Sequence, residues 1–169
     1  MKVTIVYDNT SARPDLQADW GFSALIQVKE RDILFDTGAN GDILLSNMEK
    51  LKVNSKEIEA VFISHPHWDH TGGLSSFLQL NNKVKLWVPS YLSEEKNVRE
   101  VIEVKTPTKL YEGVYSTGEL DGIEQSLCVE TEKGIMIIVG CSHPKMEHIL
   151  KAASQFGKVY GIIGGLHGN

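Results

Sequence analysis

Four side chains that can bind a metal ion fall within six consecutive residues, His65-Pro66-His67-Trp68-Asp69-His70. The apolar segment 60–63 precedes them and is expected to form a buried strand that leads directly into the cluster. In an extended segment, side chains two positions apart point to the same side, so His65 and His67 can hold one ion together. Asp69 and His70 follow where the chain turns toward a helix, and can offer a carboxylate and an imidazole to a second, adjacent ion.

The plain alternatives are a polar loop that is rich in histidine, or side chains that cap the next helix. The chain has only six histidines, and three of them lie in this cluster. His143 and His167 each follow an apolar strand and small residues, which favours further ligands. His148 falls within an amphipathic segment, where a solvated or interhelical histidine is the better interpretation. The small residues 71–73 remove side-chain bulk where the backbone must turn beside a crowded site, so we predict a metal centre.

The elements expected to position this centre alternate between strands and helices. Strands are predicted over residues 3–7, 22–28, 33–35, 60–63, 84–88, 113–115, 125–130, 135–139 and 159–163. Helices are predicted over residues 43–51, 55–58 (with Ser55 as N-cap), 74–80 and 145–156. Residues 90–110 are charged and weakly periodic, which indicates a short helix and a loop. Strands that meet helices at both ends of the chain predict layers of sheet with helices outside, an α/β or α+β sandwich.

Length, charge and cysteine content narrow the functional classes. A chain of 169 residues that is 41% hydrophobic can bury its own core, and we expect a single domain over residues 1–169. A net charge of -5 and the lack of any Lys/Arg run predict no nucleic-acid partner. Two cysteines without CxxC spacing, and an N-terminus that turns polar after six residues, predict a cytoplasmic location without a signal peptide. No apolar run approaches the roughly 20 residues of a membrane span, and a homo-oligomer is compatible with the sequence.

Several segments together resemble the metallo-β-lactamase superfamily. The segment Ser64–Leu74 resembles its HxHxDH signature, and Leu34-Phe35-Asp36-Thr37-Gly38 resembles its early FDTG strand end. Two later segments, Val139–Pro144 and Gly164–His167, resemble the GCSHP and GGxH segments of one subgroup, described as dihydropterin-ribofuranosylaminobenzene phosphate synthase-like. Asp8-Asn9 and Asp19–Ser23 also lie where members of that subgroup carry DN and ExGxS. The resemblance therefore spans most of the chain.

The resemblance implies an αββα sandwich of two mixed sheets with outer helices, shortened at its C-terminus, and metals at the edge between the sheets. The metal ligands that it implies are His65, His67, Asp69, His70, His143 and, as a weaker match, His167. It also implies that Asp36 accepts a hydrogen bond from a ligand imidazole and fixes its tautomer. The alternative role for Asp36 is to cap the turn at residues 37–38.

This chain departs from the family pattern at two places. Cys141 stands where many members have a bridging aspartate, and it can be a thiolate ligand for a soft metal or a small buried residue. The chain also ends before the late His-Cys-Thr-Gly segment of the subgroup, which weakens the second metal site. Either this is a naturally short member or a truncated one, and a partner chain would then complete the site.

The predicted function is a metal-dependent hydrolase in which a mono- or dinuclear centre activates water. Close divalent ions would lower the pKa of a bridging water and polarise a carbonyl or phosphoryl oxygen of a small substrate, for which phosphate- and pterin-containing molecules are candidates. Asp69, which can orient that water or take its proton, is the predicted catalytic side chain. The subgroup label implies instead a condensation that releases pyrophosphate. One or two Zn²⁺ ions are expected, and iron or manganese would also fit the ligands.

Two alternatives come from other features of the sequence. A metal-binding or redox-sensing protein without turnover is suggested by Cys141 and by the early C-terminus. A nuclease of the same superfamily would need a basic path across the surface, which this sequence does not show.

Overall fold

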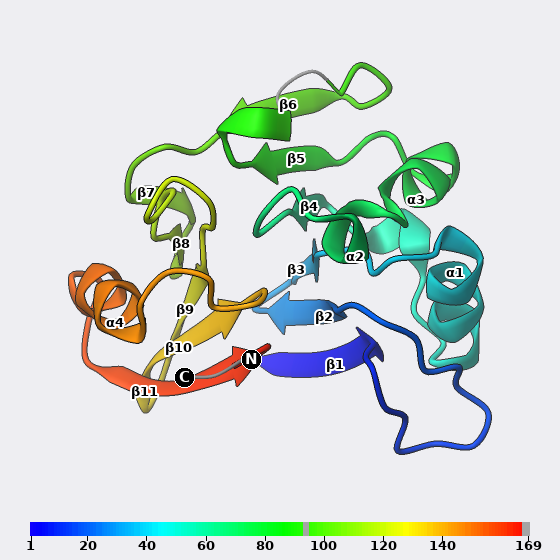
Figure 1. Ribbon diagram of the computed structural model, residues 1–169, viewed down its shortest axis with the longest axis horizontal. Coiled ribbons are helices and arrows are strands. Elements are labelled where there is room, and N and C mark those ends of the chain that lie inside the picture. The colour runs from blue at the N-terminus through cyan, green and yellow to red at the C-terminus, as the bar shows by residue number, and fades with distance from the viewer. Residues whose placement is uncertain (93–94, 167–169) are drawn as a thin grey trace.

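The computed structural model describes residues 1–92 and 95–166, which form two β-sheets packed face to face with helices on their outer faces (Figure 1). Helices α1 (Gly41–Lys50) and α3 (Leu74–Leu80) cover the first sheet, and α4 (Met146–Ser154) covers the second. This four-layer order confirms the αββα sandwich that the sequence predicted. No helix of the described chain is long and apolar enough to cross a membrane.

The first sheet has six strands in the order β1-β2-β3-β4-β5-β6. They are β1 Lys2–Tyr7, β2 Ser23–Val28, β3 Arg31–Phe35, β4 Ala60–Phe62, β5 Lys85–Val88 and β6 Glu100–Glu103. The pairs β1-β2 and β2-β3 are antiparallel, and β3 to β6 run parallel to one another. Short helical segments lie in the connections: η1 Ser55–Glu57, α2 Trp68–Thr71 and η2 Ser90–Leu92.

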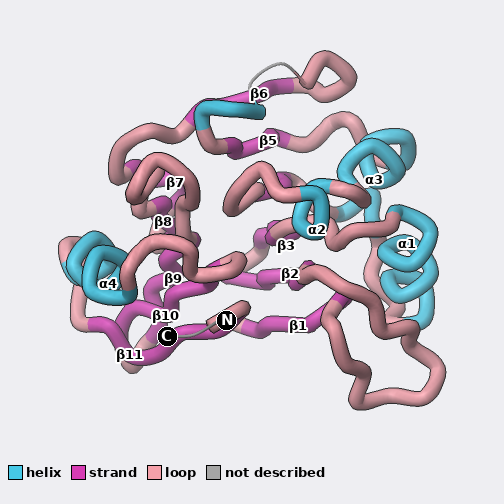
Figure 2. The backbone as a smooth tube through the Cα atoms, in the orientation of Figure 1, coloured by secondary structure: helices cyan, strands magenta, loops and turns pink. Residues whose placement is uncertain are grey.

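The second sheet has five strands in the order β11-β10-β9-β8-β7. They are β7 Thr108–Tyr111, β8 Val114–Ser116, β9 Leu127–Thr131, β10 Gly134–Val139 and β11 Val159–Gly164. The strands from β7 to β10 pair in antiparallel fashion, whereas β11 returns through α4 to lie parallel to β10. Both sheets are therefore mixed, and Figure 2 shows α4 beside the second sheet and α1 and α3 beside the first.

Side chains that point alternately to the two faces of the central strands form three apolar layers. One lies between the two sheets, and one lies under the helices on each outer face. In β3, Ile33 and Phe35 face the second sheet, while Leu34 between them packs under α1 and α3. In β10, Ile138 faces the first sheet, and Ile137 packs under α4. Successive side chains of a strand point to opposite faces, so strands covered on both faces must be apolar throughout. This is why their sequences are continuous apolar runs.

Most predicted elements are confirmed, with three corrections. Residues 90–110 form η2 and the strands β6 and β7 instead of a short helix and a loop. The N-cap of η1 is Asn54, whose side chain accepts a hydrogen bond from the backbone N–H of Lys56 at 3.1 Å, so the prediction of Ser55 as N-cap was wrong. The short helix α2, which carries Asp69 and His70 of the histidine cluster, was not predicted.

The parallel strands bring the candidate metal-binding residues to one edge of the sandwich. Strands β3 and β4 end side by side and lead into Asp36 and His65, while β10 of the other sheet leads into Cys141. The two edges approach closely at Gly140, where an added Cβ atom would lie 2.2 Å from Ser64 Oγ and 2.9 Å from His65 Nδ1. Only glycine fits there, and its absence of a side chain allows the segments that carry His65 and Cys141 to meet.

Candidate metal centre

The described residues form two sets of three donor atoms, each set lying within 4.8 Å of one another. One set is His65, His67 and His143, and the other is His65, His70 and Cys141. The four imidazole rings pack closely, with ring centroids 4.2 to 4.8 Å apart where they contact His65. His65, His70 and Cys141 are buried, whereas His67 and His143 are exposed, so the first set opens toward solvent.

The hydrogen bonds around His65 leave its Nε2 atom for a ligand. Ser64 Oγ donates its proton to Asp36 Oδ2 at 2.6 Å. The Ser64 oxygen can therefore accept a hydrogen bond from His65 Nδ1–H, 2.8 Å away. The lone pair then lies on His65 Nε2, which is buried and has no hydrogen-bond partner within the described chain. Burial, together with the nearby His70, His143 and His67, lowers the pKa of His65 to about 2. His65 is therefore a neutral imidazole, the form that binds metals.

Asp36 orients the second buried imidazole as well. His70 Nδ1 donates to Asp36 Oδ2 at 2.7 Å, which directs Nε2 toward Cys141 Sγ at 3.1 Å. Burial lowers the pKa of His70, but the Asp36 charge and hydrogen bond, with a smaller effect of Cys141, outweigh it and raise that pKa to about 10. A proton and a metal ion compete for the same Nε2 lone pair, so metal binding there releases the proton. The predicted role of Asp36 as the partner of an imidazole is confirmed.

Asp36 holds an unusual backbone conformation in order to do this. Its φ of 52° lies in the left-handed region, which costs a non-glycine residue about 1–3 kcal/mol. Its other carboxylate oxygen accepts the backbone N–H of Ser64 at 2.7 Å. Both carboxylate oxygens of Asp36 thus accept hydrogen bonds from residues 64–70. Within the described chain, neither caps the turn at residues 37–38.

The remaining predicted site residues differ in where they lie. Asp69 Oδ2 is 3.5 Å from His70 Nε2, but Asp69 belongs to neither donor set. His148 lies on α4, and its Nδ1 atom lies 2.8 Å from Asp121 Oδ1, in agreement with its interpretation as a solvated histidine. His167, the weaker predicted ligand, lies outside the described residues.

Two buried polar residues at the site were missed by sequence reasoning. Ser64 links Asp36 to His65, and its place directly before the histidine cluster was the available signal. Glu124 lies fully buried beside the segment 140–143, far from it in sequence. Burial raises the pKa of Glu124 and backbone hydrogen bonds from that segment lower it, with burial prevailing. No sequence signal pointed to it, because its partners are backbone N–H groups.

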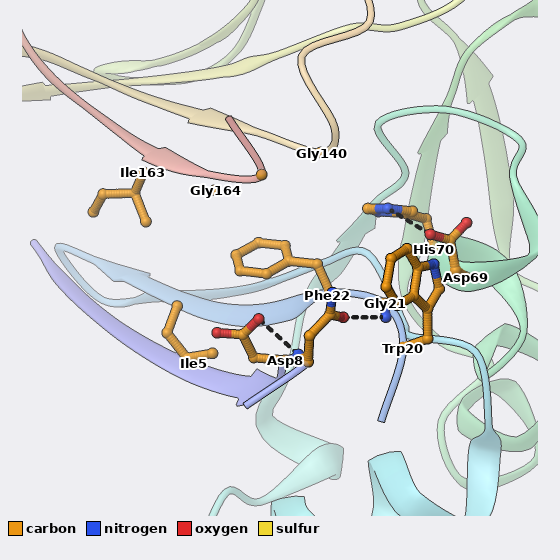
Figure 3. A pocket seen from close by; sticks show the side chains of 12 residues that line it. Ile5, Asp8, Trp20, Gly21, Phe22, Asp69, His70, Gly140, Ile163 and Gly164 are labelled. Carbon is orange, nitrogen blue, oxygen red and sulfur yellow. Dashed lines mark hydrogen bonds and ion pairs between the residues drawn. The ribbon is translucent and has the colours of Figure 1, made fainter. Parts of the chain in front are cut away.

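A cavity of about 210 Å³ opens beside the buried donor set, between the edge strands of the two sheets (Figure 3). Its floor includes Asp69 and His70, and Ile5 and Ile163 line its opposite walls. Trp20, whose exposed fraction is 56%, also lines it. The cavity therefore reaches His70 of the candidate metal centre.

Comparison with known proteins identifies the family to which the fold belongs. Residues 20–150 match the family described as the metallo-beta-lactamase superfamily, and this chain belongs to that superfamily. Its fold is that of a solved metal-dependent hydrolase of the β-lactamase superfamily, with a TM-score of 0.76 and 23% identity over 98% of this chain and 76% of that one. It also resembles a quorum-quenching N-acyl homoserine lactone lactonase, with a TM-score of 0.57 and 16% identity over 85% of this chain and 79% of that one.

One curated relative agrees with the subgroup that the sequence resembles. The chain is 28% identical to the 7,8-dihydropterin-6-methyl-4-(beta-D-ribofuranosyl)-aminobenzene-5'-phosphate synthase of Methanocaldococcus jannaschii, over 97% of this chain and 76% of the relative. That alignment has 223 positions, more than the 169 residues of this chain, so the relative carries insertions within it. Ribonuclease Z of Treponema denticola is 37% identical, but only over 44% of this chain and 24% of that protein.

Proposed function

We propose that this chain is a metal-dependent hydrolase whose metal centre is built from the two donor sets that share His65. The observation that carries this proposal is the buried, unpartnered Nε2 atom of His65, which lies among four further donors of the described chain. A buried polar atom without a partner costs about 1–3 kcal/mol, and a bound ion would remove that cost. Membership of the superfamily supports the proposal, since similar proteins include a metal-dependent hydrolase and a synthase.

We propose zinc as the ion. Imidazole nitrogen and cysteine thiolate are its characteristic ligands, and the set of His65, His70 and Cys141 supplies both. A thiolate ligand disfavours manganese, which prefers oxygen ligands. Iron therefore remains the competing candidate. The shared His65 supports either one ion held between the sets or two ions, one nearer each set. Metal analysis of the purified protein distinguishes these occupancies.

The chemistry that the ion would supply is Lewis acidity and a lower pKa for coordinated water. Asp69 lies 3.5 Å from His70 Nε2, at the floor of the cavity, with 13% of its side chain exposed. From there its carboxylate can accept a proton from the attacking water or hold that water in line. The exposed His67 leaves the first donor set accessible to the scissile group of a substrate. Asp69 is thus proposed as the catalytic carboxylate.

The cavity favours a small substrate with an apolar or aromatic part. Ile5, Phe22 and Ile163 form apolar walls, and the exposed indole of Trp20 offers a stacking surface. Asp8 is a carboxylate at the same cavity and would accept hydrogen bonds from a donor group of the substrate. No lysine or arginine lines this cavity within the described chain, which disfavours a polynucleotide. The dihydropterin and aminobenzene groups named for the archaeal relative are aromatic, and a lactone or phosphoester carrying such a ring is the proposed substrate class.

We also propose that the protein works in the cytoplasm, where thiols stay reduced. Cys128 and Cys141 are both free and buried, which agrees with a reducing compartment.

The test is a metal titration joined to a turnover assay. Protein stripped by a chelator is reloaded with zinc, cobalt, iron or manganese, and assayed on a panel of aryl lactones, acyl homoserine lactones and aryl phosphodiesters. We expect one or two bound ions and turnover that is lost when His65→Ala removes the shared ligand. Metal binding without turnover on the panel would instead support a metal-binding or redox-sensing protein, and the absence of metal binding would contradict the proposal.

A further inference from the structure

One buried carboxylate holds the whole segment that carries two of the donors. Glu124 has no exposed surface and lies in the loop that precedes β9. Its Oε1 atom accepts the backbone N–H groups of Gly140 at 2.8 Å, Cys141 at 3.2 Å and Ser142 at 3.3 Å. Its Oε2 atom accepts the N–H of His143 at 3.0 Å. Four consecutive backbone donors therefore converge on a single side chain.

Both the backbone N–H groups of residues 140–143 and the carboxylate of Glu124 need these hydrogen bonds. The segment 140–143 is neither helix nor strand, so its N–H groups need partners from outside regular structure. A carboxylate removed from water is costly unless hydrogen bonds compensate it. Successive backbone N–H groups form a concave anion site, and here the protein fills that site with its own glutamate. The result fixes the path of the backbone on which Cys141 and His143 stand.

The next residue holds the other ligand-bearing segment. The backbone N–H of Gln125 donates to the Ser64 carbonyl at 2.9 Å, and its side-chain Nε2 donates to the Ile63 carbonyl at 2.9 Å. Gln125 Oε1 in turn accepts from Ser116 Oγ at 2.7 Å, which fixes the amide orientation. Ile63 and Ser64 lead directly to His65 in the first sheet. The adjacent residues Glu124 and Gln125 thus bind the two segments that supply the proposed metal donors. Glu124 binds the segment 140–143, and Gln125 binds the segment that leads to His65.

We propose that Glu124 and Gln125 are positioning residues that set the separation between the His65 segment and the segment 140–143. They act through backbone atoms of these segments: within the described chain, neither side chain makes a hydrogen bond to a donor atom of the centre. Holding the donors at their spacing before an ion arrives reduces the ordering that binding would otherwise require. This inference rests on the proposed function, because it needs these donors to bind metal.

The test compares Glu124→Gln with the matched variant Glu119→Gln. Glu119 lies in the same loop region and accepts the backbone N–H of Ser90 at 3.0 Å, outside both ligand-bearing segments. Both variants remove one negative charge, so their net charges stay equal. We expect Glu124→Gln to weaken zinc and cobalt affinity by about 10- to 100-fold, as partners of metal ligands do, and Glu119→Gln to leave it unchanged. The thiolate-to-cobalt absorption from Cys141 should weaken in Glu124→Gln alone.

Three outcomes separate this inference from the proposed function. If the wild-type protein binds no metal, the proposed function fails and this inference fails with it. If the wild type binds metal and a folded Glu124→Gln variant keeps its affinity and cobalt spectrum, only the positioning role is overturned. If that variant does not fold, amide hydrogen exchange of the wild type decides: the amides of residues 140–143 should exchange as slowly as those of β10, and rapid exchange would overturn the inference.

Discussion

The Nδ1 atom of His70 lies 2.7 Å from Oδ2 of Asp36, a carboxylate without exposed surface directly after strand β3. The same oxygen accepts the hydroxyl of Ser64, which in turn contacts the ring of His65. One carboxylate thus orients both buried imidazoles of the proposed centre. Their Nε2 atoms are left facing the space between the two sheets, where the remaining donors converge.

Replacing this carboxylate should weaken metal binding while the ligands remain. We expect Asp36→Asn to lower zinc affinity by about 10- to 100-fold, because the amide cannot fix either imidazole as an ionised carboxylate does. Competition with a chromogenic chelator measures this affinity. The control is Asp32→Asn on β3, whose carboxylate accepts a hydrogen bond from Gln27 Nε2 at 3.0 Å, away from the centre. Equal affinities for the two variants would count against the role of Asp36.

Zinc should protect Cys141 from alkylation. Its Sγ atom lies 3.1 Å from His70 Nε2, and a thiolate that ligates an ion is no longer free to attack. We expect iodoacetamide to modify Cys141 at least about tenfold more slowly with saturating zinc than after chelation. Peptide mass spectrometry reports the modified cysteine. An unchanged rate would show that Cys141 is a small buried residue and no ligand.

Cys128 should make the fold less stable at alkaline pH. Burial raises the pKa of its thiol to about 12 from 9.0, so above pH 9 the unfolded chain loses a proton that the folded chain keeps. The contribution to the free energy of unfolding is constant below pH 9 and decreases toward pH 12, by up to about 1.4 kcal/mol per pH unit. Urea unfolding of wild type and Cys128→Ala across this range isolates the effect. Parallel pH curves for the two proteins would contradict it.

Gly140→Ala should disturb the contact between the two sheets at the proposed metal centre. The added Cβ atom would lie 2.2 Å from Ser64 Oγ, and overpacking of this kind costs about 1–3 kcal/mol. We expect lower thermal stability together with weaker zinc binding. The control is Gly161→Ala, where the nearest atom is the flexible end of Met136 at 3.1 Å. If both variants change thermal stability and zinc affinity to the same extent, the close approach at residue 140 has no special role.

The sandwich could be predicted from the sequence because its central strands are covered on both faces. Segments such as 60–63 and 135–139 are continuous apolar runs, and the histidine cluster follows the first of them. Strands β6 and β7 could not be predicted in this way. Each lies at the edge of its sheet, where partly exposed positions carry charged side chains and the apolar signal is lost.

The site could be predicted less completely than the fold. The HxHxDH motif identified His65, His67 and His70, and the segment 139–144 identified His143. The structure brings these four together, but spacing alone could not show that Asp69 lies outside both donor sets. The contacts of Glu124 were beyond sequence reasoning altogether. Its partners are backbone N–H groups some sixteen residues or more away, and such contacts leave no pattern of side chains in the sequence.

Anomalous scattering at the zinc edge, from crystals of the zinc-loaded protein, tests the central claim most directly. We predict a peak about 2.0–2.1 Å from His65 Nε2, with the other ligands taken from His67, His143, His70 and Cys141 and a zinc–sulfur distance of about 2.3 Å if Cys141 binds. A zinc-loaded crystal without a peak at bonding distance from His65 Nε2 would contradict the account.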